Sequence, residues 1–110
     1  MSKKKTDLTS LKPETRLVVA GREYAEHGIV NPAVYHASTI TFPAVKALHD
    51  RAQPYTYGRR GTPTSRAVET AIATLEGGHD CKISSSGLAA VTTTLLAFLK
   101  AGEHVLIPDT

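Results

Sequence analysis

Residues 62–108 alternate between helical and strand patterns, and this alternation constrains the fold more than any other feature of the sequence. Apolar residues recur at helical spacing after Pro63, a residue type that favours the first turn of a helix, and they stop at Gly77. Four elements are expected: a helix between Thr62 and Gly77, a strand at 81–85, a helix at 88–100 and a strand at 104–108. A strand–helix–strand unit crosses over with its two strands parallel, so the sequence predicts an α/β fold.

A parallel sheet of only two strands leaves both of its faces uncovered. The 110 residues are 41% hydrophobic and 5% aromatic, with no Trp, so any core must be built from Ala, Val, Leu and Ile. The second expected strand ends at Pro108, and open α/β sheets place their ligands at the carboxyl ends of such strands. We therefore expect an amino-terminal piece of a larger protein. A complete small domain, with further strands supplied by the preceding residues, is the alternative.

The first half of the chain carries weaker patterns and is expected to form an arm. A short helix is expected at 14–24, an extended β-branched segment at 34–43 and a second short helix at 44–51. The extended segment has no partner strand close to it in the sequence. The chain therefore divides into an N-terminal arm at 1–57 and the incomplete beginning of an α/β domain at 58–110.

The net charge of +3 is confined to the N-terminus. Residues 1–16 hold five basic and two acidic residues, whereas residues 17–110 hold eight of each. A terminal lysine run of this kind is typically solvated, so no nucleic-acid partner is expected. The sequence has neither a stretch long enough to span a membrane nor the apolar core of a secretory signal. These observations favour a cytoplasmic protein without a membrane partner.

Cysteine and histidine indicate neither a disulfide nor a metal site. Cys81 is the single cysteine, and we expect it to be a small core or strand residue. The five histidines share no metal-ligand spacing, so no metal is expected.

The run Ser84-Ser85-Ser86-Gly87-Leu88 marks the junction between an expected strand and an expected helix. The first N–H groups of a helix are unpaired and carry the positive end of its dipole, so a phosphate group could bind there. The run is neither a Walker loop nor a dinucleotide fingerprint. Ser and Gly also occur at such positions simply to cap a helix, so the run by itself leaves both interpretations open.

A second candidate site lies in Tyr55-Thr56-Tyr57-Gly58-Arg59-Arg60, just before the helix that follows Thr62. Arg is a planar, permanently charged phosphate ligand, and the Tyr hydroxyl is a compact second donor. Tyr57 and Arg59 lie two residues apart and would point the same way in an extended chain. A glycine-rich surface loop with solvated Arg side chains is the alternative.

Four motifs follow one another in a fixed order: Tyr57-Gly58-Arg59-Arg60-Gly61-Thr62-Pro63-Thr64, Leu75-Glu76-Gly77-Gly78, Ser85-Ser86-Gly87-Leu88-Ala89-Ala90 and Gly102-Glu103-His104-Val105-Leu106. Together they resemble the opening of the Cys/Met-metabolism family of pyridoxal-phosphate (PLP) enzymes, also called trans-sulfuration enzymes, over about residues 15–110. Within that family the first motif is most similar to bacterial cystathionine beta-lyases, because gamma-synthases and gamma-lyases more often have Asn where this chain has Thr62.

The resemblance implies a fold type I PLP-dependent enzyme, of which this chain would supply the arm and the first βαβ unit of the large cofactor domain. It also implies a homotetramer in which the arm crosses to a neighbouring subunit. Tyr57 and Arg59 would then bind the cofactor phosphate of the adjacent subunit. The backbone N–H groups of Gly87 and Leu88 would bind the phosphate in their own subunit.

The activity that the resemblance implies is a carbon–sulfur lyase that converts cystathionine to homocysteine, pyruvate and ammonia in methionine biosynthesis. Lys46, Lys82 and Lys100 lie in no motif matching the family's Schiff-base lysine, so we expect no catalytic residue in this chain and no activity from it alone. The alternatives are another family member, namely a cystathionine gamma-synthase, a gamma-lyase or a sulfhydrylase, and a non-catalytic binding or oligomerisation module.

Overall fold

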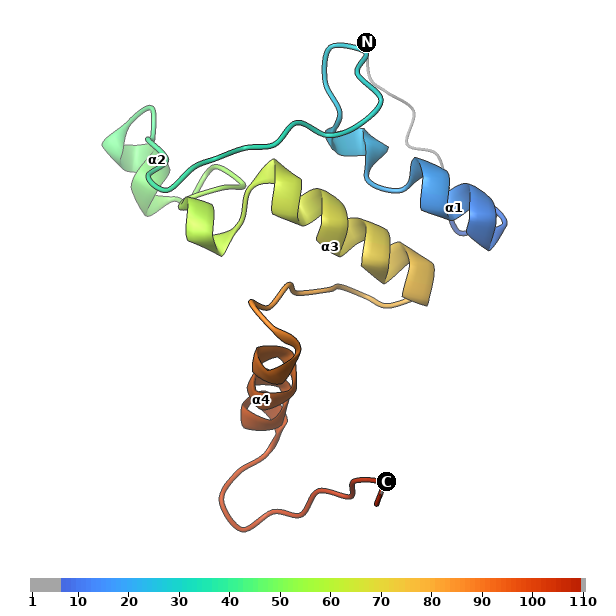
Figure 1. Cartoon of the computed structure of the whole chain (residues 1–110). Coiled ribbons are helices and arrows are strands. Elements are labelled where there is room, and N and C mark those ends of the chain that lie inside the picture. The colour runs from blue at the N-terminus through green and yellow to red at the C-terminus, as the bar shows by residue number, and fades with distance from the viewer. Residues whose placement is uncertain (1–6, 110) are drawn as a thin grey trace.

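The computed structural model describes residues 7–109, and within them it contains helices and irregular chain (Figure 1). The elements are, in chain order, α1 (Pro13–Val19), η1 (Arg22–Tyr24), α2 (Val45–His49), η2 (Gly58–Arg60), α3 (Pro63–Glu76) and α4 (Gly87–Phe98), where η denotes a 3-10 helix. Figure 1 shows α1 and η1 along α3, α2 beyond the start of α3, and α4 standing apart below them.

The longest helix is α3, and its two ends are fixed by the residues that the sequence indicated. The Thr62 side chain accepts a hydrogen bond from the Ser65 backbone N–H, and the Ser65 hydroxyl accepts one from the Thr62 N–H, which completes a capping box. Pro63 occupies the first turn. Gly77 ends the helix in the left-handed conformation, with φ of 67°. The helix expected between Thr62 and Gly77 is therefore confirmed.

The helix expected at 14–24 is broken into two pieces, because the chain turns at Gly21. This residue has φ of 82°, and a Cβ there would lie 3.2 Å from the Ala67 carbonyl oxygen of α3. Glycine thus allows both the turn and the close approach to α3. Beyond the turn, the hydroxyls of Tyr24 and Thr70 are 3.1 Å apart and share a hydrogen bond. This part of the arm therefore packs directly on α3.

The remainder of the arm crosses the start of α3 with few hydrogen bonds. Thr64 accepts one from the Tyr35 backbone N–H and donates one to the Ala33 carbonyl. Thr39 forms an isolated antiparallel bridge with Tyr57. The second short helix is confirmed as α2, although it is shorter at both ends than the pattern suggested.

Neither expected strand is present among residues 7–109, where the stretches 81–85 and 104–108 run as irregular chain. A strand is stabilised by hydrogen bonds to a partner, and neither stretch finds one. The α/β layering is therefore unconfirmed, and Cys81 is a half-buried free thiol outside any strand. The helix expected at 88–100, between these two stretches, is confirmed as α4, which begins one residue earlier than expected, at Gly87.

The described residues bury very little apolar surface. Ala25 and Ala67 are the buried hydrophobic residues, whereas Leu96 and Phe98 of α4 are 77% and 80% exposed. The radius of gyration is 17.8 Å, larger than the roughly 13 Å of a compact domain of this length. A helix made mainly of apolar residues, as α4 is, normally lies in a protein interior. No helix among the described residues is long and apolar enough to cross a bilayer.

Replacing the N-cap of α3 should loosen the whole arrangement, because α3 carries the arm. We expect Thr62→Ala to destabilise α3 by about 1 kcal/mol through loss of the side-chain cap. The measurement is helical circular dichroism together with amide exchange at residues 63–66. Thr93→Ala is the control, because Thr93 is exposed on α4 and its side chain makes no hydrogen bond. Equal helicity and exchange in Thr62→Ala and the unmodified chain would contradict the prediction.

Candidate phosphate-binding site

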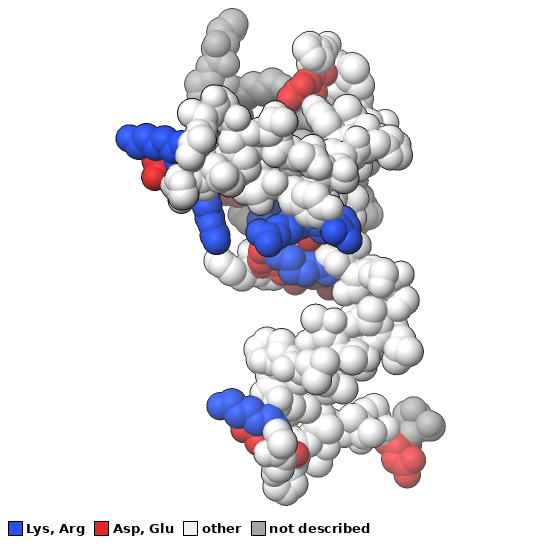
Figure 2. Space-filling view, turned by 90° about the vertical axis from the view of Figure 1, so that its left-hand side faces the viewer, with Lys and Arg blue, Asp and Glu red and all other residues white. Residues whose placement is uncertain are grey.

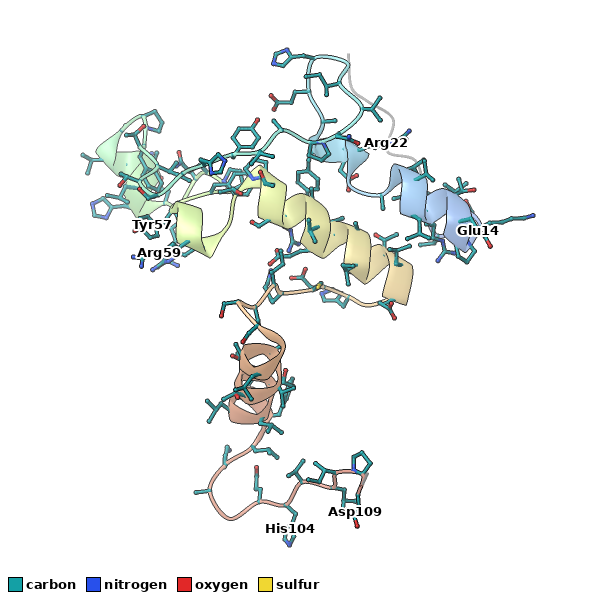
Figure 3. The ribbon with its side chains drawn as sticks, viewed as in Figure 1. Glu14, Arg22, Tyr57, Arg59, His104 and Asp109 are labelled. Carbon is teal, nitrogen blue, oxygen red and sulfur yellow. The ribbon has the colours of Figure 1, made fainter. Side chains whose placement is uncertain are left out.

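Tyr57 and Arg59 lie side by side at η2, with their polar groups in contact (Figure 3). The Arg59 Nη2 donates a hydrogen bond of 3.0 Å to the Tyr57 hydroxyl, and the guanidinium carbon is 5.0 Å from the centre of the Tyr57 ring. The two side chains therefore meet. The backbone between them is a 3-10 turn, so their contact does not depend on an extended chain. This pairing holds two donors at one place.

No carboxylate within residues 7–109 pairs with Arg59, and its side chain is exposed. The hydrogen bond from Nη2 to Tyr57 uses only one of the five N–H groups of the Arg59 guanidinium. The other N–H groups are therefore available to a ligand. An exposed, unneutralised Arg beside a phenol is well suited to binding the oxygens of a phosphate group.

Gly58 holds this pair against the arm through a close approach of two backbones. Its N–H donates a hydrogen bond of 2.7 Å to the Ser38 carbonyl, next to the bridge between Thr39 and Tyr57. A Cβ at Gly58 would collide with the Ala37 carbonyl oxygen. Glycine is therefore required here for space, since its φ is not in the left-handed region.

The second predicted site lies at the N-terminus of α4. Ser86 caps the helix by accepting a 3.1 Å hydrogen bond from the Ala89 N–H. The N–H groups of Gly87 and Leu88 make no hydrogen bond, and both residues are exposed. A Cβ at Gly87 would meet no atom within 4 Å, so the space beside it is open. These two N–H groups are thus free to bind an anion.

The two predicted parts are not brought together within one chain. Tyr57 precedes η2 and Arg59 lies within it, whereas Gly87 and Leu88 begin α4, which stands apart from α3 (Figure 3). One chain therefore carries two separate groups of exposed hydrogen-bond donors.

A cluster of four charged residues lies between these parts, and the sequence analysis missed it. Arg66 Nη1 donates to Glu69 at 3.1 Å and to Asp80 at 2.8 Å, while Lys82 Nζ lies 3.3 Å from Glu69 and 3.2 Å from Asp80. Figure 2 shows basic and acidic side chains gathered together in the middle of the molecule. The i,i+3 spacing of Arg66 and Glu69 on one helix could have predicted their ion pair. The contacts of Asp80 and Lys82 with that helix could not be predicted, because a strand was expected at 81–85. We call these four residues the α3 clamp.

The hydrogen bonds of the clamp shift the pKa values of its carboxyl groups. The Cys81 backbone N–H, followed by Arg66 and Lys82, lowers the pKa of Asp80 from 3.8 to about 2. Partial burial acts to raise the pKa of Glu69, but hydrogen bonds from Arg66, the Ile83 N–H and Lys82 outweigh it and leave the pKa lowered. The clamp is therefore fully ionised at neutral pH.

The clamp should weaken in acid because Asp80 contributes only when ionised. Its folded pKa lies below its ordinary value, so the contribution is complete above about pH 4 and is lost as the pH falls toward 2. A carboxyl-detected NMR titration should place the Asp80 midpoint near 2. Arg66→Gln should raise it toward 3.8, because one ionic partner is removed. A midpoint that Arg66→Gln does not move would contradict this account.

Comparison with known proteins places the chain in a class of enzymes. The sequence model of the family described as "Cys/Met metabolism PLP-dependent enzyme" matches residues 14–110. The structure resembles that of MetB from Corynebacterium glutamicum with a TM-score of 0.78 and 32% identity, covering 90% of this chain and 25% of that one. The class is thus that of PLP-dependent enzymes, and this likeness supports a fold of type I. The chain belongs to the Cys/Met metabolism family.

Curated relatives agree on the family and differ in their named activities. A protein of Rhizobium johnstonii, provisionally named a cystathionine beta-lyase, is 49% identical, with 86% of this chain and 24% of that protein covered. The L-alanine/L-glutamate racemase of Wolbachia pipientis wMel is 41% identical, and the match covers 90% of this chain and 28% of the racemase. Further relatives named cystathionine beta-lyase are 37% and 40% identical. The chain spans about a quarter of the length of the relatives it matches.

Adding one methyl group at Gly58 should detach η2 from the arm. We expect Gly58→Ala to break the Gly58–Ser38 hydrogen bond and to cost about 1–3 kcal/mol, because the new Cβ collides with the backbone of Ala37. Amide exchange at residue 58 and cross-peaks between residues 38 and 58 report the change. Gly87→Ala is the matched control, since its Cβ has open space and should leave the chain undisturbed. Intact cross-peaks in Gly58→Ala would show that this packing is wrong.

Proposed function

We propose that this chain is the cofactor-binding N-terminal part of a PLP-dependent carbon–sulfur lyase of the cystathionine beta-lyase type. Its substrate would be the sulfur amino acid cystathionine, and the products would be homocysteine, pyruvate and ammonia. Several curated relatives with this named activity support the proposal. The single observation that carries it is the contact of Arg59 with Tyr57, which presents charged and neutral donors together with no carboxylate on Arg59.

The residues present fit the phosphate group of PLP. The cofactor phosphate is a doubly charged anion with several acceptor oxygens, and it requires donors without competing acceptors. Arg59 and Tyr57 would donate from one subunit, while the N–H groups of Gly87 and Leu88 would donate to the phosphate bound in their own subunit. The open space at Gly87 supports this assignment, because a phosphate oxygen can approach the backbone closely there.

These residues would bind and orient the cofactor and would not take part in proton transfer. PLP, when bound, acts as an electron sink for charge that develops on the substrate. The guanidinium of Arg59 would neutralise the phosphate and fix the distance of the cofactor from η2. The helix N-terminus at Gly87 would add the favourable end of the α4 dipole. Anchoring the phosphate at two points would hold the cofactor ring in one orientation.

No residue of this chain is proposed as the catalytic amine. Lys82 is bound to Asp80 and Glu69, and these carboxylates raise its pKa, whereas a Schiff-base lysine needs a neutral amine. We therefore propose that residues 1–57 act as an arm and residues 58–110 as the start of the cofactor domain. The phosphate site would be shared between subunits of a homo-oligomer. The arm would stay packed on its own α3 at Gly21 and Tyr24 and would extend from there to a neighbouring subunit.

The relative named as a racemase shows that this region also occurs with another named reaction. A substrate panel separates the candidates for the protein that carries this chain. We expect release of pyruvate from cystathionine, and racemisation of alanine or glutamate would favour the second candidate. Release of 2-oxobutyrate in place of pyruvate would favour a gamma-lyase or gamma-synthase.

Arg59 and its neighbour Arg60 provide a matched pair of variants for the phosphate site. We expect Arg59→Ala to lower PLP affinity about ten- to a hundredfold through loss of charge-assisted hydrogen bonds. Arg60→Ala should change it little, although Arg60 is equally exposed and also has no carboxylate partner within residues 7–109. Fluorescence titration of the apoprotein with PLP gives both affinities. Equal losses in the two variants would overturn the site assignment.

A further inference from the structure

The connection at 79–86 leads from α3 to the phosphate-binding turn, and it contains neither helix nor strand. Its direct hydrogen bonds and ion pairs to α3 end on two residues of that helix, Arg66 and Glu69. No close packing between α3 and α4 supports the connection from the other side. The position of the turn relative to α3 therefore depends on these two side chains.

Glu69 is the centre of this attachment. Its Oε1 accepts a hydrogen bond of 3.4 Å from the Ile83 backbone N–H, and its Oε2 accepts from Arg66 and from Lys82. Only 14% of the Glu69 side chain is exposed, so its carboxylate is shielded and occupied on both oxygens. Ile83 lies three residues before Ser86, the cap of α4.

Arg66 adds a second attachment one turn of α3 earlier. Its Nη1 donates to both Glu69 and Asp80, so it ties the connection to the helix and holds the Glu69 carboxylate in place. The Asp80 carboxylate also accepts a 2.9 Å hydrogen bond from the Cys81 N–H, which shapes the start of the connection. Both residues project from a helix that is capped at each end, so the attachment has a rigid base.

We propose that Arg66 and Glu69 are positioning residues for the phosphate-binding turn. Through the α3 clamp they would set where the N–H groups of Gly87 and Leu88 stand, without touching the cofactor themselves. The inference rests on the proposed function, because it assigns a purpose to the clamp only if those N–H groups bind the PLP phosphate. It predicts that clamp variants bind PLP in an altered phosphate environment.

The test uses near-isosteric variants in the PLP-bound protein that carries this chain. Arg66→Gln and Glu69→Gln should each lower PLP affinity about three- to tenfold. Each should also shift the 31P resonance of the bound PLP phosphate. The double variant should lose little more than either single one, because the two residues act as one unit. Glu76→Gln is the control, since Glu76 is exposed at the end of α3 without a partner.

Three outcomes are distinguishable. Clamp variants that lower the melting temperature but match Glu76→Gln in affinity and 31P shift would overturn the positioning role, while a loss in Arg59→Ala would leave the proposed function standing. Unchanged affinity in both Arg59→Ala and the clamp variants would overturn the proposed function itself.

If Arg66→Gln or Glu69→Gln fails to fold, Asp80→Asn decides, because Asp80 is 41% exposed at the far end of the clamp. An unshifted 31P resonance in Asp80→Asn would then overturn the inference.

Discussion

The capping box of α3 is the interaction on which the other contacts depend, because α3 is the single long element that holds the arm and the connection together. Thr62 and Ser65 begin the helix, and Gly77 ends it. Between these ends, one side receives Gly21 and Tyr24 of the arm, and another side presents the α3 clamp. A frayed α3 would therefore release both halves of the chain at once.

The described chain stabilises itself through polar and backbone contacts and hardly at all through apolar burial. Its two buried hydrophobic residues are alanines, and the large apolar side chains of α4 and of 105–107 face solvent. Burial of such side chains normally contributes about 1.5–3 kcal/mol each, and little of that contribution is realised here. The exposed apolar surface is what a segment of a larger fold would present before its neighbours cover it, in agreement with the chain's share of its relatives' length.

The candidate site combines three kinds of donor that would suit a phosphate group without a dedicated loop motif. Arg59 supplies permanent charge, Tyr57 supplies a hydroxyl close to it, and the start of α4 supplies backbone donors. Each group is common by itself. Their combination gains meaning from the lack of a carboxylate on Arg59 among residues 7–109 and from the open space at Gly87. The clamp between the two parts adds ion pairs where the fold offers little apolar packing.

The sequence by itself determined the elements that depend on local interactions. The bounds of α3 follow from a cap, a proline and a glycine, and the family follows from motifs in a fixed order. The start of α4 was predicted to within one residue, because the turn at Ser86 and Gly87 marks it. Long-range contacts decided the rest. The break at Gly21 reflects its approach to Ala67, and the need for glycine at 58 reflects the backbone of Ala37. The ion pairs of the clamp join residues up to 14 positions apart, Arg66 and Asp80. The two expected strands did not form because a strand, unlike a helix, takes its hydrogen bonds from a partner that the local sequence does not contain.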